Sequence, residues 1–218
     1  HYSLRFPLLD AEPAVHADGR PRTFSYQQGH YWSDCYLNGG MTCVDCHDPH
    51  GQGYRDVFGR PLADRFADEQ CTACHASKAV RPETHTHHGP GSAGSRCVAC
   101  HMPFLQQPDV GDAIEYGRSD HTIAIPRPAF DAALGVAVAC AVCHADRTVD
   151  ALEAQAVRWY APGKPHHPTV AGLAALAADA SRAAVERLLV STDTGRARHR
   201  MAEFTVLGRW LTEHAGPD

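Results

Sequence analysis

The pentapeptide Cys-x-x-Cys-His occurs four times in this chain of 218 residues, and no other feature constrains its fold as strongly. The four copies begin at Cys43, Cys71, Cys97 and Cys140. Each copy places two thiols about one helical turn apart and an imidazole directly after the second thiol. Four repetitions of one spacing indicate four copies of the same chemical site.

Covalent attachment of haem c explains every fixed position of this motif. The two thiols add to the vinyl groups of one porphyrin, and the histidine gives the iron an axial ligand. We therefore predict four covalently attached haem c groups. The attaching thiols are Cys43, Cys46, Cys71, Cys74, Cys97, Cys100, Cys140 and Cys143, and the proximal ligands are His47, His75, His101 and His144.

Zinc sites and disulfide frameworks are the two alternatives for a chain this rich in cysteine. Paired Cys-x-x-Cys elements build zinc sites, and the eight motif cysteines could form four bridges. Neither alternative requires a histidine after every second cysteine, so haem is the preferred interpretation. The ninth cysteine, Cys35, lies outside the motifs, and we interpret it as a small buried apolar residue.

The motif region predicts an interior filled by haem rather than by side chains. The chain has only 7 Phe, 7 Tyr and 3 Trp, and Gly- and Pro-rich turns interrupt the region between the motifs. We expect a mainly α fold with extensive loops, in which a haem-packed multihaem cytochrome c core precedes a small helical tail. The expected parts are an extended N-terminal strap over 1–42, a tetrahaem domain over 43–162 and the tail over 163–218.

Periodic apolar residues predict helices after the fourth motif. Val149, Leu152, Ala156 and Tyr160 recur at helical spacing, and the pattern ends before Pro162. Three further helices are expected in the tail, over 169–178, 181–190 and 197–214. Their apolar faces are expected to pack against one another rather than to hold a cofactor.

Histidine is the expected second axial ligand of each iron. Sixteen histidines minus the four proximal ones leave twelve, whereas Met41, Met102 and Met201 are the only thioethers. Met102 directly follows His101, so it cannot reach the opposite face of the same haem. Bis-His ligation is therefore expected, and it implies lower reduction potentials than His/Met ligation gives.

Three strings of this sequence resemble multihaem c-type cytochromes related to the hydroxylamine oxidoreductase and pentahaem nitrite reductase superfamily. They are GMTCVDCHDPH at 40–50, HTHH at 85–88 continuing to CVACHMP at 97–103, and DHTIAIP at 120–126. More narrowly, they are similar to members in which a haem-rich region precedes a helical repeat tail. The resemblance extends over residues 14–214.

This resemblance implies distal ligands among the histidines outside the motifs. The ligands that it carries over are His50, His85 or His88, and His121. The fourth is either His16 or whichever of the middle pair remains, and His30 is a further candidate. Because His50 lies only three residues after His47, it should ligate a different iron. The histidines expected at the surface are His87, His166, His167, His199 and His214, and His1 is left unassigned.

The expected function is electron transfer without substrate chemistry. Catalysis by haem needs an open coordination position, and all four motifs end in histidine with further histidines to spare. Two alternatives remain: a periplasmic oxidoreductase acting on a small nitrogen compound at an open haem, and a haem-bearing docking subunit of a larger respiratory complex. Redox partner proteins or self-association through haem contacts are expected, including a homo-polymer such as an extracellular filament.

Charge and hydropathy exclude several other classes. With 20 basic against 25 acidic residues, the net charge of −5 offers no footprint for nucleic acid. The longest apolar stretch, over 132–143, is too short to span a bilayer. Haem attachment takes place outside the cytoplasmic membrane, so a periplasmic or extracellular location in a bacterium or archaeon is expected. Arg96, Arg118 and Arg127 are the expected partners of the haem propionates.

Overall fold

The structure is a computed structural model that describes residues 16, 20, 29–30, 33–51, 53–106, 117–166, 170–171, 174–175 and 181–183. Within these residues the fold is mainly α with many loops, as the sequence predicted. The α-helices are α2 (Asp34–Gly39), α3 (Glu69–Thr72), α4 (Ala76–Ala79), α5 (Glu83–Thr86), α6 (Cys97–His101), α7 (Pro128–Ala133) and α8 (Val149–Tyr160). None of them, in this part of the chain, is long and apolar enough to cross a membrane.

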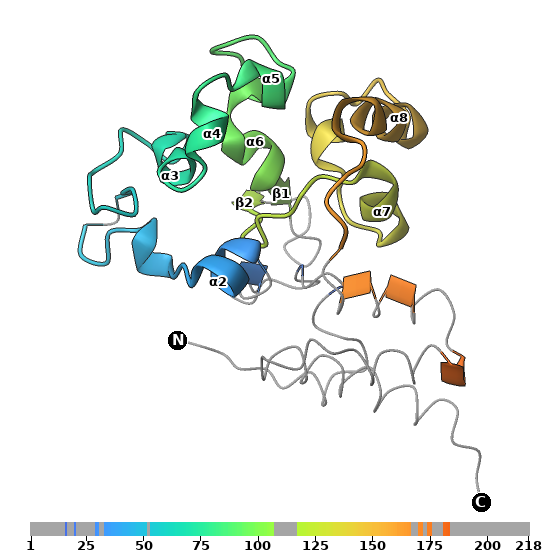
Figure 1. Ribbon diagram of the computed structural model, residues 1–218, viewed down its shortest axis with the longest axis horizontal. Helices are drawn as coiled ribbons and strands as arrows, with labels where there is room; N and C mark the ends of the chain where they lie inside the picture. The colour runs from blue at the N-terminus through green and yellow to red at the C-terminus, as the bar shows by residue number, and fades with distance from the viewer. Residues whose placement is uncertain are drawn as a thin grey trace, which may run out of the picture.

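Short 3-10 turns and one small sheet complete the described elements. The turns are η2 (Cys43–Asp45), η3 (Ala93–Ser95) and η5 (Ala139–Val142). The strands β1 (Phe104–Gln106) and β2 (Gly117–Ser119) pair antiparallel, with Phe104 opposite Ser119. Figure 1 shows α3, α6 and α8 following one another across the molecule, with the sheet below α6.

Helix α8 confirms the helix predicted after the fourth motif: it contains the four periodic residues and ends before Pro162. Thr148 caps its N-terminus, because the Thr148 hydroxyl accepts a hydrogen bond from the Ala151 N–H at 3.2 Å. Leu152 is buried, whereas Trp159 and Tyr160 at the other end are 40% and 42% exposed. The helix packs on α7, where the Glu153 carboxylate accepts a hydrogen bond from the Ala129 N–H at 3.0 Å.

The N-terminal segment is not simply extended, as the sequence had suggested. Residues Asp34–Gly39 form α2, which Ser33 caps by accepting the Tyr36 N–H at 3.1 Å. Gly40 ends the helix with φ +66, and its N–H donates to the carbonyls of the last turn. Sequence reasoning underestimated this segment because its apolar periodicity is weak, although both caps are visible in the sequence.

The predicted tail is described only at its beginning. Residues 170–171, 174–175 and 182–183 are helical and fall within the first two expected tail helices. The expected helix over 197–214 lies outside the described residues. Residues before the tail helices do contact the motif region: Lys164 forms an ion pair with Asp34, and the His166 ring lies 4.3 Å from that of Phe130.

The described part of the chain has little apolar core of its own. The buried apolar side chains there are Leu37, Val98, Val138 and Leu152. Several buried side chains are instead polar, and the Arg20–Asp131 ion pair, at 2.6 Å and almost fully buried, is the strongest of them.

Candidate haem-binding site

The four motifs share one local structure, a single helical turn that begins at the first cysteine. In three of them the histidine N–H donates to the carbonyl of the first cysteine at 2.9 Å: His47, His75 and His144. The remaining motif forms α6 itself, from Cys97 to His101. This turn places both thiols and the imidazole of each motif on one side of the backbone, as one porphyrin requires.

Three of the four motif histidines face a second imidazole from a distant part of the chain. The ring centroids of His47 and His121 are 6.2 Å apart, those of His101 and His85 are 6.1 Å apart, and those of His144 and His88 are 6.0 Å apart. The interplanar angles are 19°, 4° and 35° in the same order. Each pair therefore combines one motif histidine with one histidine from outside the motifs.

These separations fit one metal ion held between two imidazoles. Metal–nitrogen bonds of about 2 Å place two opposite ligating nitrogens about 4 Å apart, and the two rings add roughly 2 Å, giving centroids about 6 Å apart. All three measured separations agree with this value. The residues present thus fit the axial ligation of haem iron at these three motifs.

Backbone carbonyls fix the orientation of one imidazole in each pair. Nδ1 of His101 donates to the Ala124 carbonyl at 2.9 Å, Nδ1 of His121 to the Ser119 carbonyl at 2.8 Å, and Nδ1 of His88 to the Thr86 carbonyl at 2.6 Å. A carbonyl only accepts, so the proton lies on Nδ1 and the lone pair lies on Nε2. This tautomer and orientation are the ones that second-shell carbonyls impose on metal-binding histidines.

Burial also favours the neutral form of these rings. It lowers the pKa of His47, His85, His101 and His121, because charging a buried imidazole requires removing its hydration. For His101 and His121 the carbonyl hydrogen bond opposes this effect but does not cancel it. Neutral imidazole is the form that binds metal.

The second motif differs from the other three. Within the described residues, no imidazole ring is recorded at a comparable distance from His75. His50, another expected ligand, lies on an exposed loop, where its backbone N–H donates to the Asp48 carboxylate at 2.9 Å. The structure therefore does not bring His50 opposite a motif histidine.

The two N-terminal candidates are buried. His16 is 9% exposed and His30 is 7% exposed. Nε2 of His30 lies 2.8 Å from the Met41 carbonyl, which accepts its proton, so this nitrogen is not free for iron. Neither ring is recorded opposite a motif histidine in the described part of the chain.

The thiols of successive motifs lie close to one another. Cys71 and Cys97 are hydrogen-bonded, an interaction that raises the pKa of Cys71 and lowers that of Cys97. Cys74 contributes to the raised pKa of Cys46, which burial brings to about 11. The charges of Cys140 and Cys143 similarly add to the burial that raises the pKa of Cys100 to about 11. The thiols of successive motifs therefore influence one another's pKa in the order of the sequence.

The zinc and disulfide alternatives require clustered or paired cysteines. All nine cysteines are described, and all nine are free thiols. In the described part of the chain there is no group of three or more His, Cys, Asp or Glu side chains arranged to hold a metal ion. Cys35 is half-buried, in agreement with its interpretation as a packing residue.

The arginines expected at the propionates have other partners here. The Arg96 guanidinium lies 5.0 Å from the centroid of the Phe66 ring, and Arg127 donates to the Lys164 carbonyl. The side chain of Arg118 lies outside the described residues. Pairing of these cations with propionates stays a prediction.

Among the histidines assigned to the surface, His87 is exposed but stacks on Trp159, and His166 is half-buried against Phe130. Simple surface exposure is therefore wrong for His166, because the start of the tail folds back onto α7. His1, His167, His199 and His214 lie outside the described residues.

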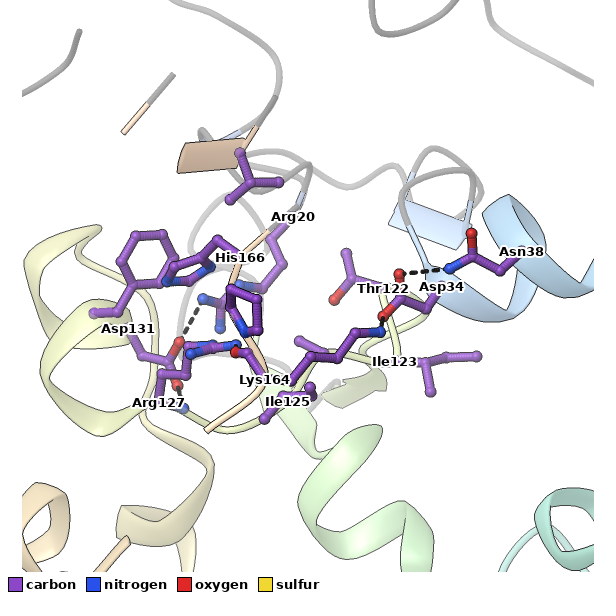
Figure 2. Close-up of a pocket in the computed structure, with 14 residues that line it drawn as sticks. Arg20, Asp34, Asn38, Thr122, Ile123, Ile125, Arg127, Asp131, Lys164 and His166 are labelled. Carbon is purple, nitrogen blue, oxygen red and sulfur yellow. Dashed lines mark hydrogen bonds and ion pairs between the residues drawn. The ribbon is translucent and has the colours of Figure 1, made fainter. Parts of the chain in front are cut away.

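A separate cavity of about 310 Å³ lies where the N-terminal segment, α7 and the start of the tail meet. Figure 2 shows Arg20 directed at Asp131 and Lys164 directed at Asp34 in this cavity. Ile123 on its wall has φ +48, a strained conformation for a β-branched residue. Charged side chains are paired across this cavity.

Two structural contributions to the site were not predicted from the sequence. The first is the set of carbonyls that orient the imidazoles, which no side-chain pattern encodes. The second is Gly94, where an added Cβ would lie 2.4 Å from Cδ2 of His88. Gly94 belongs to the glycine-containing string before the third motif. This string is the sequence signal from which a role for Gly94 could have been predicted.

Comparison with known proteins gives one partial match. No family model matches the sequence, and no solved structure matches it. The chain is 28% identical to the dissimilatory sulfite reductase MccA of Wolinella succinogenes over 98 residues, covering 35% of this chain and 13% of that protein. The chain thus spans only a small part of the length of this relative. The similarity loosely supports the resemblance to multihaem c-type cytochromes.

Proposed function

We propose that this chain is a tetrahaem c-type cytochrome that carries electrons through closely packed haems and has no substrate chemistry of its own. The observation that carries the proposal is the set of three imidazole pairs, each joining a motif histidine to a distant histidine at 6.0–6.2 Å. Haem c, when bound, supplies one-electron redox chemistry.

The chain's own residues then have three roles. The thiols of each motif tether the porphyrin, the paired imidazoles occupy both axial positions, and the carbonyls of Ser119, Thr86 and Ala124 hold the rings in place. Filling both positions leaves no place for a substrate at these irons. Two histidine ligands also favour lower potentials than a His/Met pair.

The order of the attachment points supports a continuous electron path. The thiols of the first and second, second and third, and third and fourth motifs are neighbours. Vinyl edges joined to neighbouring thiols place successive porphyrins side by side. The proposed path therefore follows the sequence from the first motif to the fourth.

The test is to produce the chain in a bacterial periplasm with haem attachment and to measure intact mass and reduction potentials. The account expects four covalent haems and four one-electron waves at low potential. A chain that carries zinc or no covalent haem after correct maturation would overturn the proposal.

A second candidate function rests on the second motif. His75 has no recorded imidazole opposite it among the described residues, so its iron is the one that could bind a substrate. The candidate is an oxidoreductase acting on a small nitrogen compound, and the partial similarity to a sulfite reductase adds sulfite to the compounds to be tested. Reoxidation of the reduced protein by hydroxylamine, nitrite or sulfite would favour this candidate, and no reoxidation would favour electron transfer.

Location and partners complete the proposal. We place the protein in the periplasm or outside the cell, with redox proteins or further copies of the chain as partners. A filament of copies is one form of this assembly, and docking of the tail on a respiratory complex is the other. Electron microscopy of the protein purified from its source distinguishes them, because only the first gives filaments.

A further inference from the structure

The segment His85–His88 supplies an imidazole to two different motifs. His85 lies opposite His101 of the third motif, and His88 lies opposite His144 of the fourth. On a continuous helix, residues three apart would lie on the same face and would point to the same site. The backbone must therefore change direction between His85 and His88, so that their side chains point to different motifs.

His87 makes this turn. Helix α5 (Glu83–Thr86) ends at His87, which adopts the left-handed conformation with φ +55. A non-glycine residue adopts this conformation only when its surroundings hold it there. The His87 ring stacks on the indole of Trp159, with centroids 4.4 Å apart and planes within 9°. This stack is the contact that holds the turn.

Tyr160 holds the other end of the segment. Its hydroxyl donates to the His85 carbonyl at 2.5 Å, and its ring lies 5.8 Å from the His85 ring in an edge-on arrangement. Trp159 also meets His88 edge-on at 6.5 Å. Two consecutive residues at the end of α8 thus contact all three histidines of the segment.

Helix α8 connects these contacts to the fourth motif. It begins five residues after His144, and its twelve residues span about 18 Å. Its contacts with η5 and α7 keep it fixed relative to the motif. The helix therefore sets the position of a distal imidazole relative to the proximal imidazole of the same pair.

Gly94 provides the space that His88 needs. A Cβ at this position would lie 2.4 Å from Cδ2 of His88 and 2.8 Å from its Nε2, well inside van der Waals contact. The His88 ring is therefore confined between Trp159 on one side and η3 on the other.

We propose that Trp159, Tyr160 and Gly94 are positioning residues that hold the His85–His88 segment between the third and fourth haems. We call these three residues the clamp, and together they fix the positions of both distal ligands. The inference rests on the proposed function, because it assumes iron between the paired imidazoles. It predicts that damage to the clamp changes two haem sites and leaves the first unchanged.

The experiment uses the full chain with its haems attached and compares six variants by electron paramagnetic resonance of the oxidised form and by CO uptake of the reduced form. H85A and H88A give the reference spectra for loss of each ligand. G94A should reproduce the H88A spectrum, with about one additional haem per chain binding CO. W159L should alter the signals of both sites, and V157A, an exposed neighbour on the same helix, should alter neither.

The outcomes separate the two proposals. A G94A protein with the wild-type spectrum, or a W159L protein indistinguishable from V157A, would overturn the clamp while leaving the electron-transfer proposal intact. A wild-type protein without low-spin haem would overturn the proposed function itself. Y160F provides the finer test: it retains the ring but removes the bond to the His85 carbonyl, so it should shift the third site more than the fourth.

Discussion

The first, third and fourth motifs differ from the second in what the rest of the chain brings to them. Segments 119–124 and 85–88 cross the motif region and place an imidazole opposite His47, His101 and His144. No described segment does the same at His75. The motif alone therefore specifies the two attachment thiols and one imidazole. The second imidazole depends on one of these two crossing segments, and each segment is held in place by its own contacts.

The crossing segments are held in different ways. Asp120 anchors the first, because its buried carboxylate accepts hydrogen bonds from the Thr122 N–H at 2.8 Å and hydroxyl at 2.7 Å. The second is held by aromatic contacts from α8. The pairing of the imidazoles is thus a consequence of tertiary packing.

The largest effect is expected from removing a ligand supplied by a crossing segment. H121A should leave the first iron five-coordinate, so about a quarter of the oxidised haem signal should become high-spin. Electron paramagnetic resonance measures this fraction. H166A, which removes a ring that packs on Phe130, is the control and should give the wild-type spectrum. A wholly low-spin H121A spectrum would contradict the assignment.

The second site should exchange ligands more readily than the other three. Reduced wild-type protein should bind about one CO per chain at this site, because no segment among the described residues places an imidazole opposite His75. H50A tests the loop histidine. If CO uptake is negligible in the wild type and appears only in H50A, then His50 is a firm ligand and the contrast between the sites is wrong.

Stability should depend on the buried ion pair near the first crossing segment. D131N removes the Asp131 carboxylate that pairs with the buried Arg20 guanidinium, and removing one partner of a buried ion pair costs about 3–5 kcal/mol. Denaturant unfolding measures the change. K164M removes the exposed ion pair with Asp34 and should cost less than about 1 kcal/mol. Equal effects of the two variants would show that the Arg20–Asp131 pair has no special role.

The smallest effect concerns Cys35, the thiol that remains after haem attachment. Burial and the negative charge of Asp34 raise its pKa above the usual 9.0, so at neutral pH it is almost entirely the unreactive thiol. Alkylation followed by mass spectrometry should therefore be slow at pH 7 and accelerate as the pH rises past 9.

D34N removes one cause of the raised pKa of Cys35 and should increase its alkylation rate at pH 8. Because Cys46 and Cys74 lie near Cys35, this rate reports on the contact between the first and second sites. Rapid alkylation of Cys35 in the wild type at pH 7 would show that reagent reaches this thiol and that the first and second sites are not in contact there.

The sequence predicted the parts of the site that depend on local spacing. The attachment turns and α8 follow from neighbours within a few residues, and the structure has both where expected. Candidates for the distal ligands came from a resemblance, and it left His85 and His88 as alternatives. The structure uses both in pairs because the left-handed turn at His87 separates them, and a non-glycine residue in that conformation leaves no sequence signal.

The remaining features depend on contacts between distant residues. The Ala124 carbonyl that orients His101 is 23 residues away, and Tyr160 is 75 residues from the His85 carbonyl that it binds. Neither contact follows from periodicity or composition. His50 shows the reverse case: a recognisable string predicted a ligand, but within the described residues no contact joins its exposed ring to a motif histidine.

Electron paramagnetic resonance of the oxidised wild-type protein, combined with its intact mass, tests the central claim most directly. The account predicts four covalent haems, three of them low-spin with two histidine ligands, and any high-spin or exchangeable signal confined to the second motif and lost in H75A. Fewer than four haems, or high-spin signal from more than one of them, would contradict it.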